Sequence, residues 1–402
     1  MIFRIALRNA FRNKRRTTLS LLIIALGTGL LFTLGAFVTF INTAMRDGTV
    51  EYVGSLQIAD TGFWNQNSAV KETVISPDER EELEQLLREV PGVRQVAGQI
   101  EVQAQLQYGR ASQIVYGVAV EPDRAVFSAY QVAQGAPLAP GDRGNLLVGE
   151  SLAMAYGIEV GDYVTLLAST IAGAFNTARL QVTGLIRMST ETDEAFTVVF
   201  STTTAQDLLR MRGVNKLVVA LDDLDEAGRV AALLSEPIQR IRSTFSPRTW
   251  DQLSPEFLQT RSLFQFILGS VSLAIFVLVF FVILEVLTMS FLERTREIGT
   301  IRAIGTQRSQ VFRQLIAESV LLALLGALGG AVIGIGLSTA INAAGVLWHV
   351  PGEIEPTLIR VILSPAGFVL PLCMALVSTL VSAVFPAVRT TRRSVVDALR
   401  TT

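Results

Sequence analysis

The stretch LSLLIIALGTGLLFTLGAFVTFI, residues 19–41, decides the architecture because it contains no Asp, Glu, Lys or Arg. A helix needs about 20 apolar residues to cross a bilayer, and this run is long enough. Further uncharged runs lie at 263–284, 319–348 and 361–388. The mean hydropathy of the chain, +0.45, is too apolar for a purely soluble protein. The sequence therefore predicts a membrane protein with four transmembrane α-helices.

The segments between these runs differ in charge. Residues 42–262 hold 18 Lys and Arg against 28 Asp and Glu, a net of −10, whereas 285–318 carries five arginines. The tail from 389 has four arginines against Asp397 alone, and the start of the chain has no acid but six cations: Arg4, Arg8, Arg12, Lys14, Arg15 and Arg16. Basic loops stay in the cytoplasm. We therefore expect both termini and the 285–318 loop to be cytoplasmic, and one large domain to lie outside.

The expected organisation follows from these runs and their flanks. It comprises, in order, a cytoplasmic amphipathic helix (1–16), transmembrane helix 1 (17–41), an external domain with a stalk (42–262), transmembrane helix 2 (263–292), a short cytoplasmic helix (293–308), transmembrane helix 3 (309–345), an external loop (346–364), transmembrane helix 4 (365–388) and a cytoplasmic tail (389–402). A signal peptide is a weaker interpretation of the basic start, because the apolar run is long and no small-residue cleavage site follows.

Composition excludes several classes of function. The basic residues line membrane flanks rather than one domain face, which argues against nucleic-acid binding. Cys373 is the only cysteine and lies within the fourth run, so the external domain is expected to have no disulfide. His349 is the only histidine, which makes a histidine-based metal or acid–base site improbable; we expect no metal site and no catalytic residues.

The external domain is expected to be α+β. Ser76 and Glu79 form a capping box around Pro77, which predicts a helix from Ser76 to Val90. Alternating apolar residues or short apolar runs predict strands at 53–59, 93–107, 112–120, 179–187, 196–201 and 216–221. Residues 146–167 indicate strand, helix, turn and strand; 204–212 and 224–234 indicate helices. We expect two interleaved subdomains and a helix over 245–262 leading into the second span.

Three features inside the predicted spans need interpretation. Gly326, Gly330 and Gly334 recur every four residues, a spacing that lets helices approach closely. Packing within the same bundle is favoured over contact between subunits. Pro371 and Pro386 predict local kinks in the fourth span. Glu285, an acid at the cytoplasmic side of the second span, is expected to snorkel or to pair with arginine rather than to relay protons.

The segment MSFLERTREIGTIRAIGTQRSQVFRQLIAES, residues 289–319, predicts a short charged helix between two spans, ended by Gly305. A span, a tight cytoplasmic helix and a returning span make a rigid elbow. Such an elbow can dock into a groove on a cytoplasmic partner, although a charged loop is more often a solvated turn.

This segment resembles the FtsX/MacB/LolC-LolE class of ABC-transporter permeases. The resemblance rests first on an ER-x-x-EIG-x-x-RAIG block: Glu293, Arg294, Glu297, Ile298, Gly299, Arg302, Ala303, Ile304 and Gly305. The arginine-rich entry (7–22), the G-E-x-LA…G-x-x-x-GD pattern at 148–166 and the tail at 385–400 support it. The tail departs from the family pattern at Val388 and Val396. The resemblance covers nearly the whole chain. It implies an inner-membrane protein with a MacB-like periplasmic domain inserted between helices 1 and 2.

The resemblance implies a dimer of permease subunits, homo- or heteromeric, seated on two cytoplasmic ATPase subunits that bind ATP and Mg. Movement of the ATPases would pass to the spans by mechanotransmission through Glu293, Arg294, Arg296, Glu297, Gly299, Arg302 and Gly305. The sequence has no G-x-x-x-x-GK-[ST] motif and no Gly-Lys pair, so ATP hydrolysis is expected in a partner protein.

Residues 53–64 resemble the lipoprotein-releasing LolC/LolE branch, which implies extraction or export of lipoproteins or other amphiphilic substrates. In that branch a loop recruits a periplasmic carrier, and residues 168–179 occupy its place here as a short run of small residues. Transport predicts an apolar cavity between paired helices 1 and 2, lined by Leu30, Phe37, Phe40, Phe264 and Ile267, unless these side chains simply face lipid. The alternatives are an FtsX-like signalling subunit that activates a periplasmic partner, or a drug or peptide efflux permease.

Overall fold

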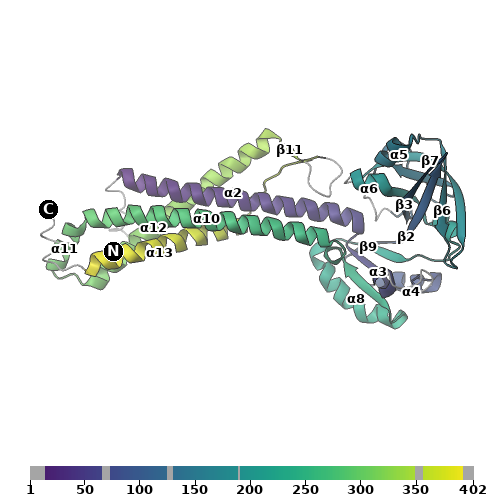
Figure 1. Ribbon diagram of the computed structural model, residues 1–402. Helices are drawn as coiled ribbons and strands as arrows, with labels where there is room; N and C mark the ends of the chain where they lie inside the picture. Colours follow the sequence, from purple (N-terminus) through teal and green to yellow (C-terminus); the bar gives the residue numbers. More distant parts are fainter. Residues whose placement is uncertain (1–13, 66–72, 125–129, 189–190, 349–355, 393–402) are drawn as a thin grey trace. The chain divides into compact units, whose positions relative to one another are not determined.

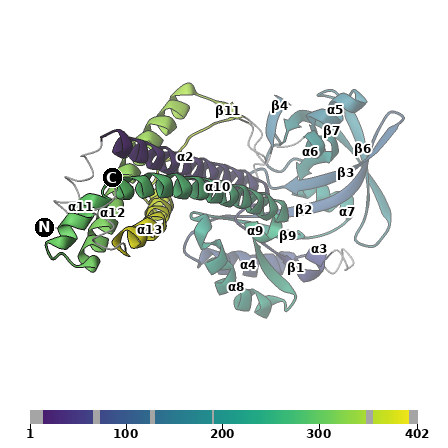
Figure 2. The same ribbon diagram turned by 60° about the vertical axis from the view of Figure 1, so that its left-hand side comes forward.

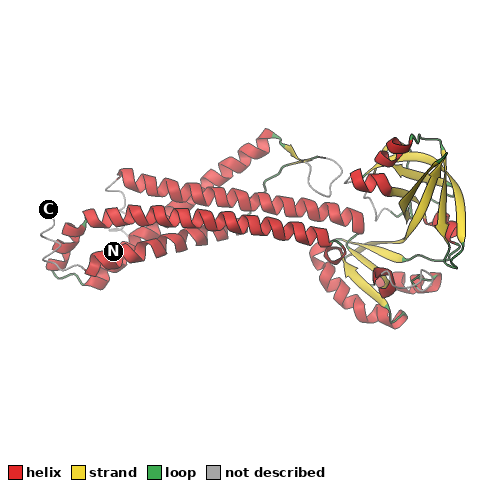
Figure 3. Ribbon diagram, in the orientation of Figure 1, coloured by secondary structure: helices red, strands yellow, loops and turns green. Residues whose placement is uncertain are grey.

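The computed structural model describes residues 14–65, 73–124, 130–188, 191–348 and 356–392. These residues divide into two units: a helical unit (1–42, 260–348 and 358–402) and an inserted domain (43–259 and 349–357). Most of the expected amphipathic helix at 1–16 and of the tail lies outside the described residues. Figures 1 and 3 show the long helices of the first unit and the strands gathered in the second.

The helical unit contains the candidate membrane spans. Among the described residues, four helices are long and apolar enough to cross a bilayer. They are α2 (Lys14–Val53), α10 (Pro255–Glu293), α12 (Arg308–Ala344) and α13 (Val369–Arg392), accompanied by α11 (Thr295–Ala303), η3 (Ala366–Phe368), β11 (Leu347–Trp348) and β12 (Thr357–Leu358). Their shared core contains Ile24, Val279, Phe291, Leu315 and Ala383.

The helices differ from the expected bounds mainly at their ends. α2 continues to Val53, twelve residues past the expected end of the first span, and α13 continues past 388 to Arg392. The helix expected over 245–262 is wrong in its first part, because Phe245–Thr249 form strand β10. Trp250–Leu253 form the short helix α9, and α10 begins only at Pro255.

The inserted domain is built on ten described strands in one connected sheet. They are β1 (Leu56–Asp60), β2 (Val93–Tyr108), β3 (Ala111–Val120), β4 (Gln131–Gly135), β5 (Asn145–Gly149), β6 (Tyr163–Ser169), β7 (Phe175–Arg187), β8 (Thr197–Ser201), β9 (Lys216–Leu221) and β10. The helices are α3 (Thr61–Asn65), α4 (Pro77–Arg88), α5 (Glu150–Tyr156), α6 (Glu191–Phe196), α7 (Thr202–Leu209), η2 (Leu224–Glu226), α8 (Ala227–Ile241) and α9.

The long strand β2 belongs to both halves of this domain. Its first half pairs with β9, in the sheet order β10-β1-β9-β2, and its second half pairs with β3 and β6. From there the pairings β3-β8, β8-β5, β5-β7, β7-β6 and β6-β2 close a barrel among the described strands. The chain leaves the first half after β2 and returns to it at β9, so two interleaved subdomains are present (Figure 2).

Helices α4 and α8 complete the first half of the domain. The predicted capping box is confirmed, since the Ser76 hydroxyl accepts from the Glu79 N–H and the Glu79 carboxylate accepts from the Ser76 N–H at 2.8 Å. Apolar residues at helical spacing turn inward to join one core with the strands: Leu83 and Leu87 from α4, and Val230, Leu234 and Ile238 from α8. This burial of apolar area is the main stabilising contribution.

Candidate coupling elbow

The chain between α10 and α12 forms a compact elbow, defined here as residues 293–308. α10 ends at Glu293, Arg294 makes the bend, and α11 ends at Ala303. Gly305 has a φ of +108°, a left-handed conformation that favours glycine, and its N–H donates to the Arg302 carbonyl at 3.1 Å. Gln307 and Gln310 then form a capping box at the start of α12. Hydrogen bonds therefore terminate α11 at a defined position rather than leaving its end frayed.

The inner face of α11 is anchored in the core of the helical unit. Thr295, Ile298 and Gly299 are its buried residues, and Ile298 belongs to the same cluster as Phe291 and Val311. The Thr295 hydroxyl donates to the Phe291 carbonyl at 3.2 Å, which ties the first turn of α11 to the end of α10.

The outer face of α11 combines exposed apolar and basic side chains. Ile304 is 82% exposed and Ile301 is also exposed. Arg296 of α11 and Arg308, the first residue of α12, are also exposed. Exposed isoleucines at the tip of a basic helix are suited to a groove on a partner protein. We did not predict Ile301 and Ile304 as contact residues from sequence, although Ile304 belongs to the family block.

The predicted coupling residues fall into three groups. Exposed positions are Glu293, Arg296 and Gly305, and half-buried positions are Glu297 and Arg302. Gly299 is buried. Arg294 is also half-buried, and its guanidinium contacts Glu318 of α12 at 3.0 Å and Glu297 at 3.7 Å. Sequence reasoning missed Glu318, whose partner lies 24 positions earlier in the chain.

The three glycines of α12 lie against α2. A Cβ placed on Gly326 would stand 2.6 Å from Ile24, and one on Gly334 would stand 2.8 Å from Phe32. Gly330 and Gly29 approach each other, since a Cβ on Gly330 would stand 3.0 Å from the Gly29 nitrogen. The structure thus places the predicted small-residue stripe at a contact within the chain.

The predicted substrate-cavity residues differ in their exposure within the helical unit. Leu30 and Ile267 are exposed, whereas Phe37, Phe40 and Phe264 are half-buried. The Phe37 ring lies 6.5 Å from the Phe40 ring and 6.1 Å from the Trp348 ring, so this side chain packs within the chain.

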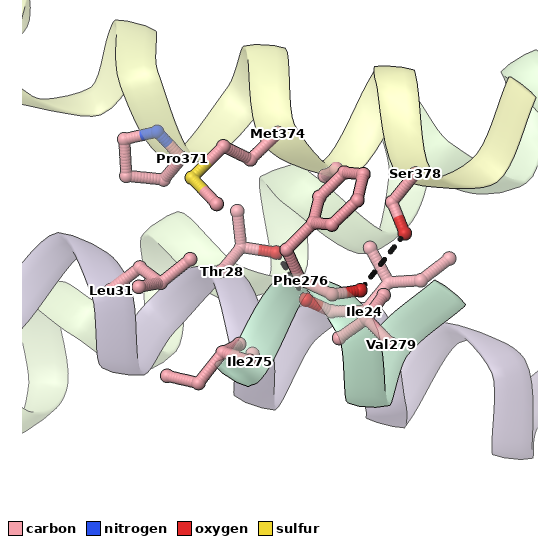
Figure 4. Close-up of a pocket in the computed structure, with 11 residues that line it drawn as sticks. Ile24, Thr28, Leu31, Ile275, Phe276, Val279, Pro371, Met374 and Ser378 are labelled. Atoms are coloured by element: carbon pink, nitrogen blue, oxygen red, sulfur yellow. Dashed lines mark hydrogen bonds between the residues drawn. The ribbon is translucent and has the colours of Figure 1, made fainter. Parts of the chain in front are cut away.

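A small cavity lies between α2, α10 and α13 (Figure 4). Its volume is about 10 Å³, and Thr28, Phe276, Met374 and Ser378 are among its lining residues. The Ser378 hydroxyl donates to the Phe276 carbonyl at 3.4 Å across this contact. A volume of that size holds at most about one water molecule, so this cavity has no room for an acyl chain.

Residues 168–179 form a β-hairpin tip that contacts α7. The Thr170 N–H donates to the Ala174 carbonyl at 2.7 Å, which closes the turn between β6 and β7. The Ile171 N–H donates to the Leu209 carbonyl at 3.1 Å, and the Asn176 amide donates to the Leu208 carbonyl at 2.8 Å. Phe175 remains 78% exposed beside this anchored turn.

Comparison with known proteins assigns both units to described families. Residues 17–236 match the MacB-like periplasmic core domain, and residues 269–395 match the FtsX-like permease C-terminal family. The first match alone covers more than half of the chain. The solved periplasmic region of MacB from Actinobacillus actinomycetemcomitans aligns with 51% of this chain and 94% of its own, at 14% identity and a TM-score of 0.38.

Relatives are similar over parts of their length. The chain is 31% identical over 162 residues to the macrolide export ATP-binding/permease protein MacB of Wolinella succinogenes, covering 39% of this chain and 25% of that protein. It is 25% identical over 279 residues to the lipoprotein-releasing system transmembrane protein LolC of Xylella fastidiosa, covering 65% of this chain and 66% of that protein. It is 28% identical over 130 residues to the ABC transporter permease YknZ of Bacillus subtilis, covering 32% of this chain and 33% of that protein.

These matches agree with the two units described above. The MacB-like core domain lies between the first long helix and the later three, and the FtsX-like region contains the elbow. Together they make this an inner-membrane protein with a periplasmic domain. The chain belongs to the MacB/FtsX/LolC-type family of ABC transporter permeases.

Proposed function

We propose that this chain is the permease subunit of a mechanotransmission-type ABC transporter. It couples ATP hydrolysis by a partner ATPase in the cytoplasm to extraction or export of lipoproteins or other amphiphilic substrates at the periplasmic side. Both termini and the elbow are cytoplasmic, as the excess of arginine in these segments indicates. The chain itself carries no step of the hydrolysis.

The geometry of α11 is the observation that carries this proposal. Its inner face is fixed by Ile298 in the core of the helical unit, and its outer face leaves Ile301 and Ile304 exposed. α11 is fixed in the core of the helical unit on one side and exposes apolar side chains on the other. A force applied by a docked partner would therefore pass through α11 to the neighbouring helices. Because interface anchors are apolar side chains that fill pockets, Ile304 is the proposed anchor in the ATPase groove.

The length of the flanking helices supports mechanical coupling. α2 has 40 residues and α10 has 39, about twice the number that a bilayer requires. Residues 43–53 of α2 and 255–259 of α10 belong to the inserted domain. Displacement of either helix at the elbow end would therefore reach the periplasmic domain through a continuous helix.

The substrate class follows from the relatives and from the surface of the spans. Two of the relatives described above are named for macrolide export and lipoprotein release, and the proposed common property of the substrate is an amphiphilic character. The cavity among α2, α10 and α13 is too small for such molecules. We place the substrate between two permease subunits, against exposed apolar residues such as Leu30 and Ile267.

Docking of the ATPase is tested by charge and polarity changes at the elbow. Ile304→Asp, Glu297→Arg and Arg302→Glu should each lower the amount of ATPase that co-purifies with the permease, by more than about tenfold for a central apolar anchor. Ser309→Ala, an exposed change just beyond the elbow, is the matched control. Wild-type co-purification and stimulated ATP hydrolysis in all three variants would refute docking at the elbow.

The substrate is identified by mass spectrometry of the complex purified gently from its native membrane. A stoichiometric ATPase with an acylated protein or a defined amphiphile supports transport. An ATPase with a periplasmic hydrolase or sensor, and no enriched lipid species, would replace transport with FtsX-like signalling.

A further inference from the structure

One ion pair joins the bend of the elbow to α12 and is not part of the proposed docking surface. The Arg294 Nη1 atom donates to both carboxylate oxygens of Glu318, at 3.1 and 3.0 Å. The Nε atom of the same guanidinium lies 3.7 Å from the Glu297 carboxylate. Arg294 thus faces α12 within its own chain, whereas Arg296, two positions later, is exposed.

Both partners of this pair are largely removed from solvent. The Glu318 side chain is 8% exposed and the Arg294 side chain is 19% exposed. Taking such charges out of water is costly, and losing one partner leaves the other buried and uncompensated. Leu315, Leu321 and Leu322, three or four positions from Glu318 on α12, are also buried. Because a buried ion pair is weak evidence for net stability, a role in fixing the local geometry is the alternative.

The ion pair connects the bend of the elbow to the interior of α12. Arg294 is the single residue between the end of α10 and the start of α11, so it sits where the elbow bends. Glu318 lies ten residues into α12, about 15 Å along that helix at 1.5 Å per residue. The contact therefore braces the bend against a point well inside the returning span, while Ile298 anchors the inner face of α11.

We propose that the Arg294–Glu318 ion pair is a brace that sets the angle of α11 relative to α10 and α12. Arg294 and Glu318 are positioning residues: they hold the docking helix stiff so that a push on its tip moves the spans instead of bending the elbow. This inference rests on the proposed docking function of α11. It assigns Arg294 to the interior of the permease rather than to contact with the ATPase.

The test uses the full-length permease with its ATPase in lipid nanodiscs. Spin labels on Ala303→Cys in α11 and Leu328→Cys in α12, both exposed positions, report the elbow geometry. The background is Cys373→Ser, because Cys373 is an exposed free cysteine. The variants are Arg294→Glu, Glu318→Arg and their double exchange, with Arg296→Glu, an exposed arginine two positions after Arg294, as the matched change. Readouts are the label distance distribution, the ATPase that co-purifies, and release of an acylated lipoprotein, used as the probe substrate, per ATP hydrolysed.

Each single reversal at the brace should broaden the distance distribution and lower release per ATP by about tenfold, within the range found for coupled pairs. The double exchange should restore both readouts. Arg296→Glu should instead lower ATPase binding and leave the distances narrow. If a reversal does not fold, Glu318→Gln keeps the shape without the charge and should broaden the distances to a smaller extent.

Two outcomes would overturn the brace. One is a narrow distance distribution and normal coupling in both single reversals. The other is loss of ATPase binding in Arg294→Glu with unchanged distances and no rescue by Glu318→Arg, which would make Arg294 a docking residue. Failure of the proposed docking function can be told apart from failure of the brace. Normal ATPase binding in Arg296→Glu and Ile304→Asp would show that the ATPase docks elsewhere. The label distances would still show whether the ion pair fixes the elbow.

Discussion

At the scale of single residues, this chain uses close backbone contact where a soluble protein would use large apolar side chains. Lipid is as apolar as leucine, so helices in a membrane gain little from hiding leucine from it. The Gly29–Gly330 approach lets α2 and α12 touch along their backbones. Hydroxyls add a second kind of contact, since the Ser382 Oγ donates to the Phe280 carbonyl at 2.9 Å and joins α13 to α10.

Replacing Gly330 therefore should separate α2 from α12. A Cβ at this position would stand 2.9 Å from the Ala25 carbonyl oxygen and 2.7 Å from the Thr28 Cβ, both on α2. We expect Gly330→Val to lower the free energy of unfolding by about 1–3 kcal/mol, the usual cost of overpacking. Gly336→Val on the same helix is the control, because a Cβ added at Gly336 would meet no atom within 4 Å. Thermal unfolding in detergent should separate the two variants, and equal midpoints would contradict the contact.

The polar network around α4 predicts a dependence of stability on acid pH. Burial alone would raise the pKa of Glu84, but hydrogen bonds and charges from Arg80 and Arg124 lower it overall. Burial likewise opposes the Ser76 and Arg242 contacts at Glu79, whose pKa is also lowered overall. A carboxyl with a lowered folded-state pKa stabilises the fold above its unfolded pKa, about 4.3 for Glu, and loses this contribution as the pH falls through the folded value.

We therefore expect the urea midpoint of the inserted domain to fall below about pH 4.3. It can be followed by tryptophan fluorescence of the full chain in detergent. Glu84→Gln should lower the midpoint at pH 7 and make the acid loss shallower. Glu236→Gln, which removes an exposed pair with Arg240, is the matched control and should change neither. The same acid slope in Glu84→Gln and wild type would rule out a contribution from this network.

At the scale of elements, local signals were readable from sequence and long-range pairings were not. The helix α4 was predictable because Ser76, Pro77 and Glu79 specify its start within four residues. Strand β10 was predicted as helix. It contains Pro247, which argues against a central strand, but β10 lies at the end of the sheet order, where a proline is tolerated. The elbow was predictable from its sequence block, whereas Glu318 was not, because its partner is on another helix.

The anchored hairpin tip at 170–173 changes how a carrier contact should be tested. Deleting 168–178 would remove the ends of β6 and β7 and the contacts with Leu208 and Leu209, so it should destabilise the domain whether or not a carrier binds. Phe175→Ser alters the exposed side chain alone. We expect it to leave the thermal midpoint unchanged and to lower co-purification of any carrier that binds here. Unchanged carrier binding would exclude Phe175 from the contact.

At the scale of the whole molecule, the second span is the least covered of the four. Only 17% of its most apolar window is buried, against 44%, 39% and 33% for the windows of α2, α12 and α13. Its exposed residues include Glu285 as well as Leu278 and Phe281. A charged side chain costs about 2.5–3.5 kcal/mol at the centre of a span on insertion scales, and less where it can snorkel to the interface. We expect a second protein surface, rather than lipid, against this side of α10, because this span is the least covered and carries Glu285.

Cross-linking of two differently tagged copies tests that arrangement. In a Cys373→Ser background, Leu30→Cys in one copy and Ile267→Cys in the other should be joined by a bismaleimide if α2 and α10 meet across a dimer. Val332→Cys in both copies is the control, since Val332 is also apolar and exposed but lies on α12. Equal cross-linking through Val332 would refute the proposed pairing. If the two copies are not cross-linked to each other but one is cross-linked to another membrane protein in the native host, the permease forms a heterodimer. The substrate path would then lie at the surface shared with that protein.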